Sequence, residues 1–260
     1  MAGFADSPYF LIVLLASAFT MPLVFMVWIR NSARHSREPW RFVLKSFVWG
    51  AVFSVIVAII FSLVLVATLG QVGPLNEFLV RRFHDPDIVV LVLGAVIVAP
   101  IVEEAAKGLG VRAGRPEIQR LIDGLVYGAA AGLGFSATEN LFYGLNQLLS
   151  PEGGATASLA VIAIRSFSSS FLHASASAVL GYGLAKSWLT RRAWAFLGFY
   201  LIAVTMHASF NLLTVIGQLY AIEYGAIAEV VSFVAAVIFA IVAITVIRSK
   251  LASRVQPIQR

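Results

Sequence analysis

Seven long apolar segments dominate this chain of 260 residues and restrict the folds that it can adopt. A helix needs about 20 residues to cross a hydrocarbon core about 30 Å thick. The segments cover residues 9–29, 42–69, 88–111, 121–148, 157–186, 194–218 and 226–247. Hydrocarbon offers exposed backbone amides no partner, so every crossing segment must be helical. We therefore predict an all-α, polytopic membrane bundle of about seven transmembrane helices, with residues 1–260 forming one transmembrane domain in the cell membrane.

The composition excludes several other classes of protein. Only 12% of the residues are charged, whereas a soluble domain carries about 25%. The chain has no cysteine, which rules out disulfides, thiolate metal sites and a cysteine nucleophile. Its net charge of +6 would suggest nucleic acid as the partner of a soluble protein. Here the charge follows from the loops, and we expect the lipid bilayer and no nucleic acid as a partner.

Positive charges gather in alternate loops. The basic residues are Arg30, Arg34, Arg37, Arg41 and Lys45; Lys107, Arg112, Arg115 and Arg120; Lys186, Arg191 and Arg192; and Arg248, Lys250, Arg254 and Arg260. The other loops are acidic, with Arg81 and Arg82 as their only bases, and only Arg165 departs from this pattern, within the first turns of the fifth span. Since cytoplasmic loops carry the excess of Lys and Arg, we predict an outside N-terminus and a cytoplasmic C-terminus. No basic stretch precedes the first segment, so we expect a retained helix, not a signal peptide.

Ionisable residues lie deep inside four of the spans. They are Glu103, Glu104, Glu139, His173 and His207, and they define a motif-bearing core over about residues 88–218. An acid at bilayer depth costs about 2.5 kcal/mol or more, so such residues usually face a wet cavity and have a function. At a rise of 1.5 Å per residue, Glu104, Glu139 and the two histidines fall in a band about 13 Å deep. We predict that they meet in one hydrated active site.

Helical spacing groups these residues further. Lys107 follows Glu103 by four positions and Glu104 by three, so one helix face carries all three. Lys107 can keep one carboxylate ionised while the other stays protonated, which would give an acid and a base. Asn211 follows His207 by four positions. Each group also has a structural explanation: helix-end pairing for the glutamates, hydrogen bonding in the core for the histidines, and interhelical contact for Asn211.

These residue types suit hydrolysis by activated water, in two versions. In the first, Glu103 or Glu104 is the general base, and His207 with Asn211 stabilises an oxyanion. In the second, one Zn²⁺ is held by Glu139, His173 and His207, a set of ligands found in catalytic zinc sites. The sequence has no H-E-x-x-H pair, the usual evidence for zinc. Spacing alone does not choose between the two versions.

Two motifs resemble those of a known family. Glu103-Glu104-Ala105-Ala106-Lys107 is similar to the E-E-x-x-K motif of PrsW-type intramembrane proteases, and Phe135 to Glu139 is similar to their F-x-x-x-E motif. The resemblance covers about residues 98–213. In the related CAAX prenyl endopeptidases the first motif ends in Arg and the second in His. Lys107 and Glu139 therefore favour the PrsW branch.

The resemblance implies an intramembrane endopeptidase that cleaves a membrane-anchored protein. The expected substrate is a single-span anti-sigma factor, cut at the first step of a stress-signalling cascade. The residues implicated are Glu103, Glu104, Glu139, His173, His207 and Asn211. The family is described both as metallo-type and as glutamate-dependent, so the resemblance leaves the cofactor open between no metal and one Zn²⁺.

A second hypothesis is a proton-coupled carrier or channel that uses the same Glu and His residues as a relay. Carriers often show inverted repeats and discontinuous helices in both halves. We find no such repeat, and the polar groups share one depth instead of forming a ladder across the membrane. The sequence therefore favours the protease.

Overall fold

The computed structural model describes residues 8–33, 37–151 and 153–252, and over these it contains helices and no strand. The elements are α1 (Pro8–Ser32), α2 (Trp40–Val48), η2 (Trp49–Ser54), α3 (Val55–Gly70), α4 (Gly73–Phe83), α5 (Pro86–Leu91), η3 (Val92–Val98), α6 (Ala99–Val111), η4 (Arg112–Gly114), α7 (Leu121–Leu149), α8 (Ala155–Phe167), α9 (Ser169–Thr190), η5 (Ala193–Phe196), α10 (Leu197–Tyr224) and α11 (Ala226–Ala252). Within the described residues, seven helical stretches are long and apolar enough to span a membrane. The predicted all-α class and number of spans are confirmed.

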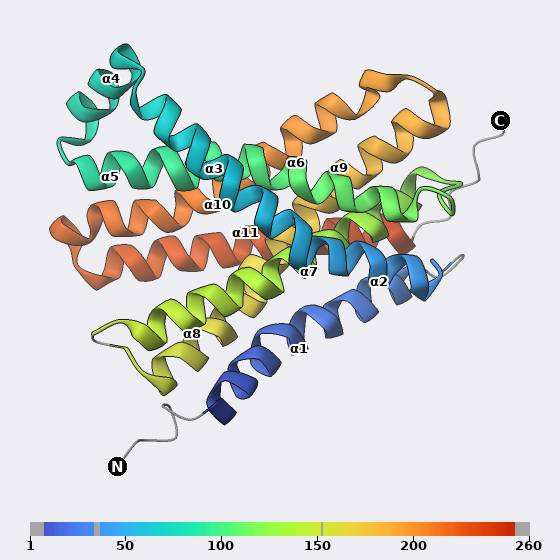
Figure 1. The fold of residues 1–260 in the computed structure, drawn as a ribbon, viewed down its shortest axis with the longest axis horizontal. Helices are drawn as coiled ribbons and strands as arrows, with labels where there is room; N and C mark the ends of the chain where they lie inside the picture. The colour runs from blue at the N-terminus through green and yellow to red at the C-terminus, as the bar shows by residue number, and fades with distance from the viewer. Residues whose placement is uncertain (1–7, 34–36, 152, 253–260) are drawn as a thin grey trace.

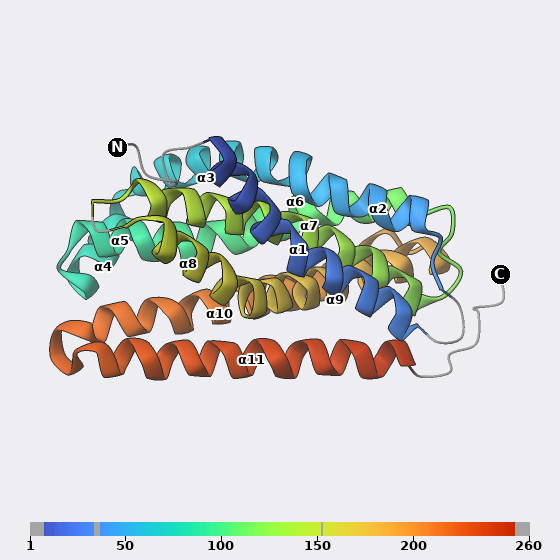
Figure 2. The same cartoon turned by 90° about the horizontal axis from the view of Figure 1, so that it is seen from below.

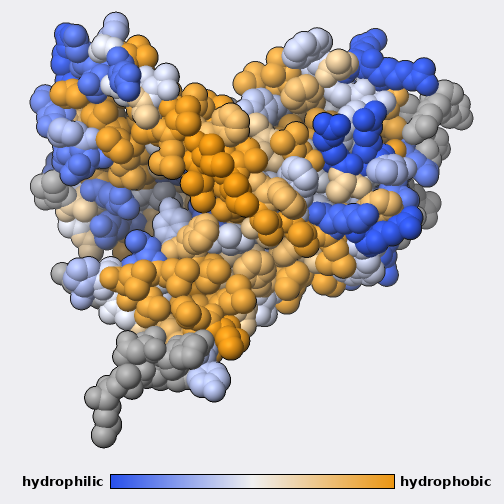
Figure 3. Space-filling model, viewed as in Figure 1, coloured by the Kyte–Doolittle hydropathy of each residue, from blue (hydrophilic) through white to orange (hydrophobic). Residues whose placement is uncertain are grey.

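The stretch α7 forms the centre of the bundle (Figures 1 and 2). Of its most apolar part 89% is buried, whereas the other spans bury at most 39% of theirs. The outer helices present apolar side chains outward, and Figure 3 shows these as a hydrophobic band between two hydrophilic ends. This distribution is typical of a protein whose middle lies in lipid. The centre of α7 is thus the part of the molecule furthest from lipid.

Three glycines let α7 lie directly against α9. Gly124, Gly128 and Gly132 are spaced by four residues and share one helix face. A Cβ at these positions would lie 2.1–2.2 Å from a backbone carbonyl oxygen of α9, in turn those of Gly181, Ser177 and His173. Small residues allow such close approach between membrane helices. The glycine face therefore fixes the distance between α7, which carries Glu139, and α9, which carries His173.

We expect Gly128→Ala to destabilise the fold. The added methyl would lie 2.1 Å from the Ser177 carbonyl oxygen, and backbone cannot rotate away as a side chain can. Overpacking of this kind costs about 1–3 kcal/mol. Thermal unfolding of the detergent-purified protein measures the effect. Gly198→Ala is the matched control because nothing lies within 4 Å of that position; an equal loss in both variants would contradict the close-packing explanation.

Three of the described spans change their helical pattern along their length, and the second does so through the π-helical segment Trp49–Ser54. The third span runs through a π-helical segment, Val92–Val98, before Pro100. The π pattern pairs each carbonyl with the amide five residues on, and for Ala95 that residue is Pro100, which has no N–H. Asn211 Nδ2 donates to the Ala95 oxygen at 2.7 Å instead. The fifth span is interrupted at Ser168, between α8 and α9.

A buried carboxyl group joins the α1–α2 connection to α7. Glu38 is 3% exposed and accepts a hydrogen bond from the Tyr127 hydroxyl, while its backbone oxygen accepts one from Arg30 Nε at 2.7 Å. Burial raises the pKa of the Glu38 carboxyl to about 7; Asp123 adds to the rise and the Tyr127 hydrogen bond opposes it. Glu38 is therefore protonated more readily in the folded protein than in the unfolded chain.

This shift makes stability depend on pH in a defined direction. Between the ordinary pKa of 4.5 and the folded value of about 7, the native state binds more protons, so stability falls as pH rises through this window. Glu38→Gln cannot ionise and should lack this part of the slope. The difference in melting temperature between Glu38→Gln and the parent should grow in favour of the variant from pH 5 to pH 8. A constant difference across the range would refute the raised pKa.

Candidate active site

The carboxylates of Glu103 and Glu104 lie on α6, one turn from a buried lysine. Lys107 Nζ donates to Glu104 Oε1 at 2.9 Å and to Glu103 Oε2 at 3.2 Å. The side chains of Lys107 and Glu104 are fully buried, whereas that of Glu103 is 13% exposed. The Lys107 ammonium also lies 4.1 Å from the centre of the Phe135 ring. The shared helix face expected for Glu103, Glu104 and Lys107 is present.

His207 reaches the same carboxylates from α10. Its Nδ1 lies 3.0 Å from Glu104 Oε1, and its Nε2 lies 3.8 Å from Glu103 Oε2. Ser177 Oγ of α9 donates to the other oxygen of Glu104 at 2.8 Å. Both oxygens of Glu104 are thus engaged by neighbours. Glu103 keeps one oxygen, Oε1, to which the described residues donate no hydrogen bond.

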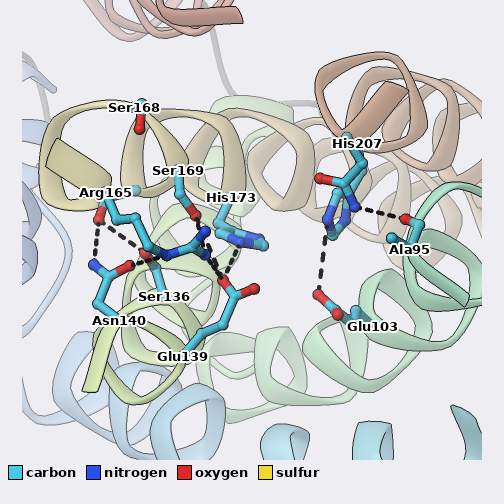
Figure 4. Close-up of polar contacts among 12 residues, drawn as sticks. Ala95, Glu103, Ser136, Glu139, Asn140, Arg165, Ser168, Ser169, His173 and His207 are labelled. Atoms are coloured by element: carbon cyan, nitrogen blue, oxygen red, sulfur yellow. Dashed lines mark hydrogen bonds and ion pairs between the residues drawn. The ribbon is translucent and has the colours of Figure 1, made fainter. Parts of the chain in front are cut away.

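His173 of α9 lies between the two groups of acids. Its Nε2 is 2.8 Å from Glu139 Oε2, and its Nδ1 is 2.8 Å from Lys107 Nζ. A carboxylate accepts from Nε2–H and an ammonium donates to Nδ1, so this geometry fits a neutral imidazole protonated on Nε2. The rings of His173 and His207 are 4.8 Å apart and nearly perpendicular. Figure 4 shows both imidazoles directed into the space between Glu139 and Glu103.

Arg165 explains why one basic residue departs from the loop pattern. Its Nη2 lies 2.8 Å from Glu139 Oε2, and its Nε donates to Asn140 Oδ1 at 3.2 Å (Figure 4). The guanidinium also stacks 3.6 Å from the Tyr143 ring centre and donates to Ser169 Oγ at 3.1 Å. Arg165 therefore positions the Glu139 carboxylate, which in turn contacts His173. In the sequence, Arg165 stood out only as the one base that departs from the loop pattern.

Asn211 lies one turn from His207 but is occupied elsewhere. Its amide nitrogen donates to the Ala95 carbonyl in η3, and no hydrogen bond joins it to either glutamate among the described residues. Ser177, by contrast, was missed by the sequence analysis although it contacts Glu104. Its position four residues after His173 on the same face of α9 was the available signal.

One group of side chains has the chemistry of a metal site. Glu103, His173 and His207 each offer a ligand atom, and these atoms lie within 4.8 Å of one another. The metal ligands expected from the sequence were Glu139, His173 and His207, whereas the structure groups Glu103 with the two histidines. Glu139 instead contacts Nε2 of His173.

The hydrogen bonds around the two histidines fit a bound metal ion. Glu104 contacts Nδ1 of His207, and Glu139 contacts Nε2 of His173. Metal-binding histidines characteristically give their outer N–H to a carboxylate or similar acceptor. The remaining nitrogens are left for the ion, together with Glu103, in a His₂Glu set. An ion on Nδ1 of His173 must replace the present contact with Lys107.

Comparison with known proteins identifies the family of this chain. The sequence pattern of the PrsW family of intramembrane metalloproteases matches residues 38–246. The chain belongs to this family. It is similar to Protease PrsW of Clostridioides difficile (strain 630), with 26% identity over 208 residues, which cover 77% of this chain and 78% of that protein. No solved structure matches.

Family membership and fold together define the protein at the level of its class. The PrsW-family chain is a multi-pass membrane protein and an intramembrane protease. The E-E-x-x-K and F-x-x-x-E motifs lie within the matched range. The carboxylates of these two motifs are linked through Lys107 and His173.

Proposed function

We propose that this protease hydrolyses a peptide bond of a single-span membrane protein with water activated at Glu103. One observation carries the proposal: Glu103, His173 and His207 converge from three helices, and each histidine has a carboxylate on its outer nitrogen. An anti-sigma factor is the substrate that the two motifs imply. The proposed site consists of Glu103, Glu104, Glu139, His173 and His207, with Asn211 supporting the backbone nearby.

Glu103 is better suited than Glu104 to be the general base. A base must reach the proton of its water directly. Glu103 is partly exposed, and its Oε1 has no donor among the residues that the structure describes. Glu104 is fully buried, and both its oxygens are occupied by Lys107, His207 and Ser177. Glu104 would therefore orient His207 and anchor Lys107, and Lys107 would place positive charge beside the carboxylate that takes the proton.

The charge of the site favours a bound cation. Three carboxylates face two basic groups here, so neutral imidazoles leave one net negative formal charge. We propose that Glu103, His173 and His207 would hold one Zn²⁺, with Glu103 using one carboxylate oxygen for the ion, which leaves its other oxygen to take the proton from water. When bound, zinc supplies a Lewis acid toward the peptide carbonyl and makes a water easier to deprotonate. Glu139 and Glu104 then hold the imidazoles in the tautomers that leave Nδ1 of His173 and Nε2 of His207 unprotonated.

The arrangement of charge also supports an orientation. The connections α1–α2, α6–α7 and α9–α10 and the end of α11 lie at one end of the bundle, on the right in Figure 1. These are the basic segments, so we propose that this end faces the cytoplasm and that the N-terminus lies outside. We also propose that this membrane is the plasma membrane.

Removal of metal should abolish cleavage of a single-span reporter in proteoliposomes. We expect dialysis against a chelator to reduce turnover at least 100-fold and stoichiometric Zn²⁺ to restore it, because two imidazoles and a carboxylate lose their shared ion. His207→Ala should be inactive before and after zinc is added. Turnover that survives complete metal removal would exclude the zinc proposal. Proton flux through the same vesicles without any cleavage would exclude hydrolysis and favour a carrier.

A further inference from the structure

A cavity lies apart from the polar site. It measures about 640 Å³ and opens between α6, α9, η5 and α10. Its wall is largely apolar, with Leu109 from α6, Leu184 and Trp188 from α9, and Leu197 from α10. Sites for small molecules are usually apolar and about 300–1,000 Å³ in volume. The size and lining are those of a binding site, and neither proposed ligands nor proposed bases line it.

Two arginines stand at the basic end of this cavity. Arg112 and Arg115 both line it and both are exposed. The structure gives neither an ion pair with any described acidic side chain. Glu117, two residues from Arg115, pairs with Arg41 at 3.5 Å instead. The Arg115 guanidinium lies 5.4 Å from the ring centre of Trp188, so the indole supports it at the mouth of the cavity.

We propose that this cavity binds one anionic phospholipid, with an acyl chain along the apolar wall and the phosphate held by Arg112 and Arg115. Arginine forms strong paired hydrogen bonds to phosphate oxygens. Basic residues near an anionic leaflet attract anionic lipid, and Trp favours the level of the headgroups. The acyl chain and the phosphate of the lipid would thus each contact a complementary surface in one cavity.

The flanking segment of a protein substrate fits the same place less well. A single-span protein carries its excess of Lys and Arg on the cytoplasmic side, which is the side we assign to the arginines. Two unpaired guanidinium groups would repel such a segment, whereas they attract a phosphate. The charge therefore selects the lipid over the peptide.

The occupied cavity would join the two helices that carry Glu104 and His207. It reaches Ala105, the residue after Glu104 on α6, and Tyr200 on α10. The Tyr200 hydroxyl donates to the Ile101 carbonyl at 2.7 Å and already links these helices. The contact between His207 and Glu104 also joins them. A lipid between them adds a further link, so its binding should raise the melting temperature of the full chain. This consequence does not depend on the proposed hydrolysis.

The test uses the purified full-length chain in detergent with phosphatidylglycerol or phosphatidylcholine of the same acyl chains. Native mass spectrometry should show one retained phosphatidylglycerol under conditions that remove phosphatidylcholine, and phosphatidylglycerol alone should raise the melting temperature. Arg112→Gln with Arg115→Gln should weaken retention at least tenfold. Arg191→Gln with Arg192→Gln removes the same charge at the same end of the bundle, outside the cavity, and should retain the lipid. Inorganic phosphate should give no thermal shift.

A variant that blocks the apolar part provides an independent measurement. Ala105→Phe adds a ring to the wall of the cavity and leaves both arginines in place, so it should also lose the retained lipid. If the two double arginine variants lose the retained lipid equally, retention depends only on the general surface charge, and the proposal is overturned. Equal retention of both lipids, or full retention in Ala105→Phe, would overturn it as well. If the arginine pair fails to fold, Ala105→Phe decides the question alone.

Discussion

Glu103→Gln should lower turnover of a single-span substrate about 100- to 10,000-fold, the usual contribution of a general base. The amide keeps the size of the side chain but does not take a proton from water. Glu104→Gln should cost less, about 10- to 100-fold, because Glu104 acts through His207 and Lys107. Steady-state kinetics in proteoliposomes measure both values.

The order of these two losses is the informative part. Both variants must first show the melting temperature and vesicle insertion of the parent, because each glutamate lies beside a buried lysine. A larger loss in Glu104→Gln than in Glu103→Gln would reverse the assigned roles. Undiminished turnover in Glu103→Gln would remove Glu103 from the mechanism.

Arg165→Gln should lower activity about 10- to 100-fold although this residue is not placed to contact substrate. Groups that orient a metal-binding histidine typically have effects of this size. Without the guanidinium, Glu139 loses its 2.8 Å ion pair and is left to position His173 with weaker donors. Zinc affinity, measured by competition with a chromogenic chelator, should fall with activity. Most of the loss should appear in kcat because Arg165 acts through Glu139 and His173.

Conservative replacement separates positioning from simple structural support. Arg165→Lys keeps the positive charge near Glu139 and should recover part of both zinc affinity and turnover. Arg81→Gln is the control, since Arg81 forms an exposed ion pair with Glu77 on α4, and such pairs contribute little. Loss of activity with unchanged zinc affinity in Arg165→Gln would show that Arg165 does not act through His173.

Hydropathy predicted most of the fold. The seven spans follow from the length of the apolar segments, because lipid leaves the backbone no alternative to the helix. Hydropathy did not predict where the helices change to a π-helical pattern or break. The π segment Val92–Val98 directly precedes Ala99 and Pro100, and Asn211 donates to its Ala95 carbonyl. The break at Ser168 lies between α8 and α9. Hydropathy averages over such local features.

Depth in the bilayer predicted which side chains of the site could meet, and the structure brings Glu103, Glu104, His173 and His207 together. Depth says nothing about the rotation of each helix about its axis. Rotation decides that Glu103 shares a potential metal site with the imidazoles, whereas Glu139 lies behind His173. The glycine face of α7 sets how α7, with Glu139, lies against α9, with His173, through contacts that one sequence does not reveal.

X-ray absorption at the zinc edge of the active, zinc-loaded protein tests the central claim most directly. The account predicts two imidazole nitrogens at about 2.0–2.1 Å and a carboxylate oxygen at about 2.0–2.2 Å. The oxygen ligand should be lost in Glu103→Gln, one imidazole should be lost in His173→Ala, and all ligands should remain in Glu139→Gln. An ion that keeps its ligands in Glu103→Gln, or loses its oxygen in Glu139→Gln, would contradict the account.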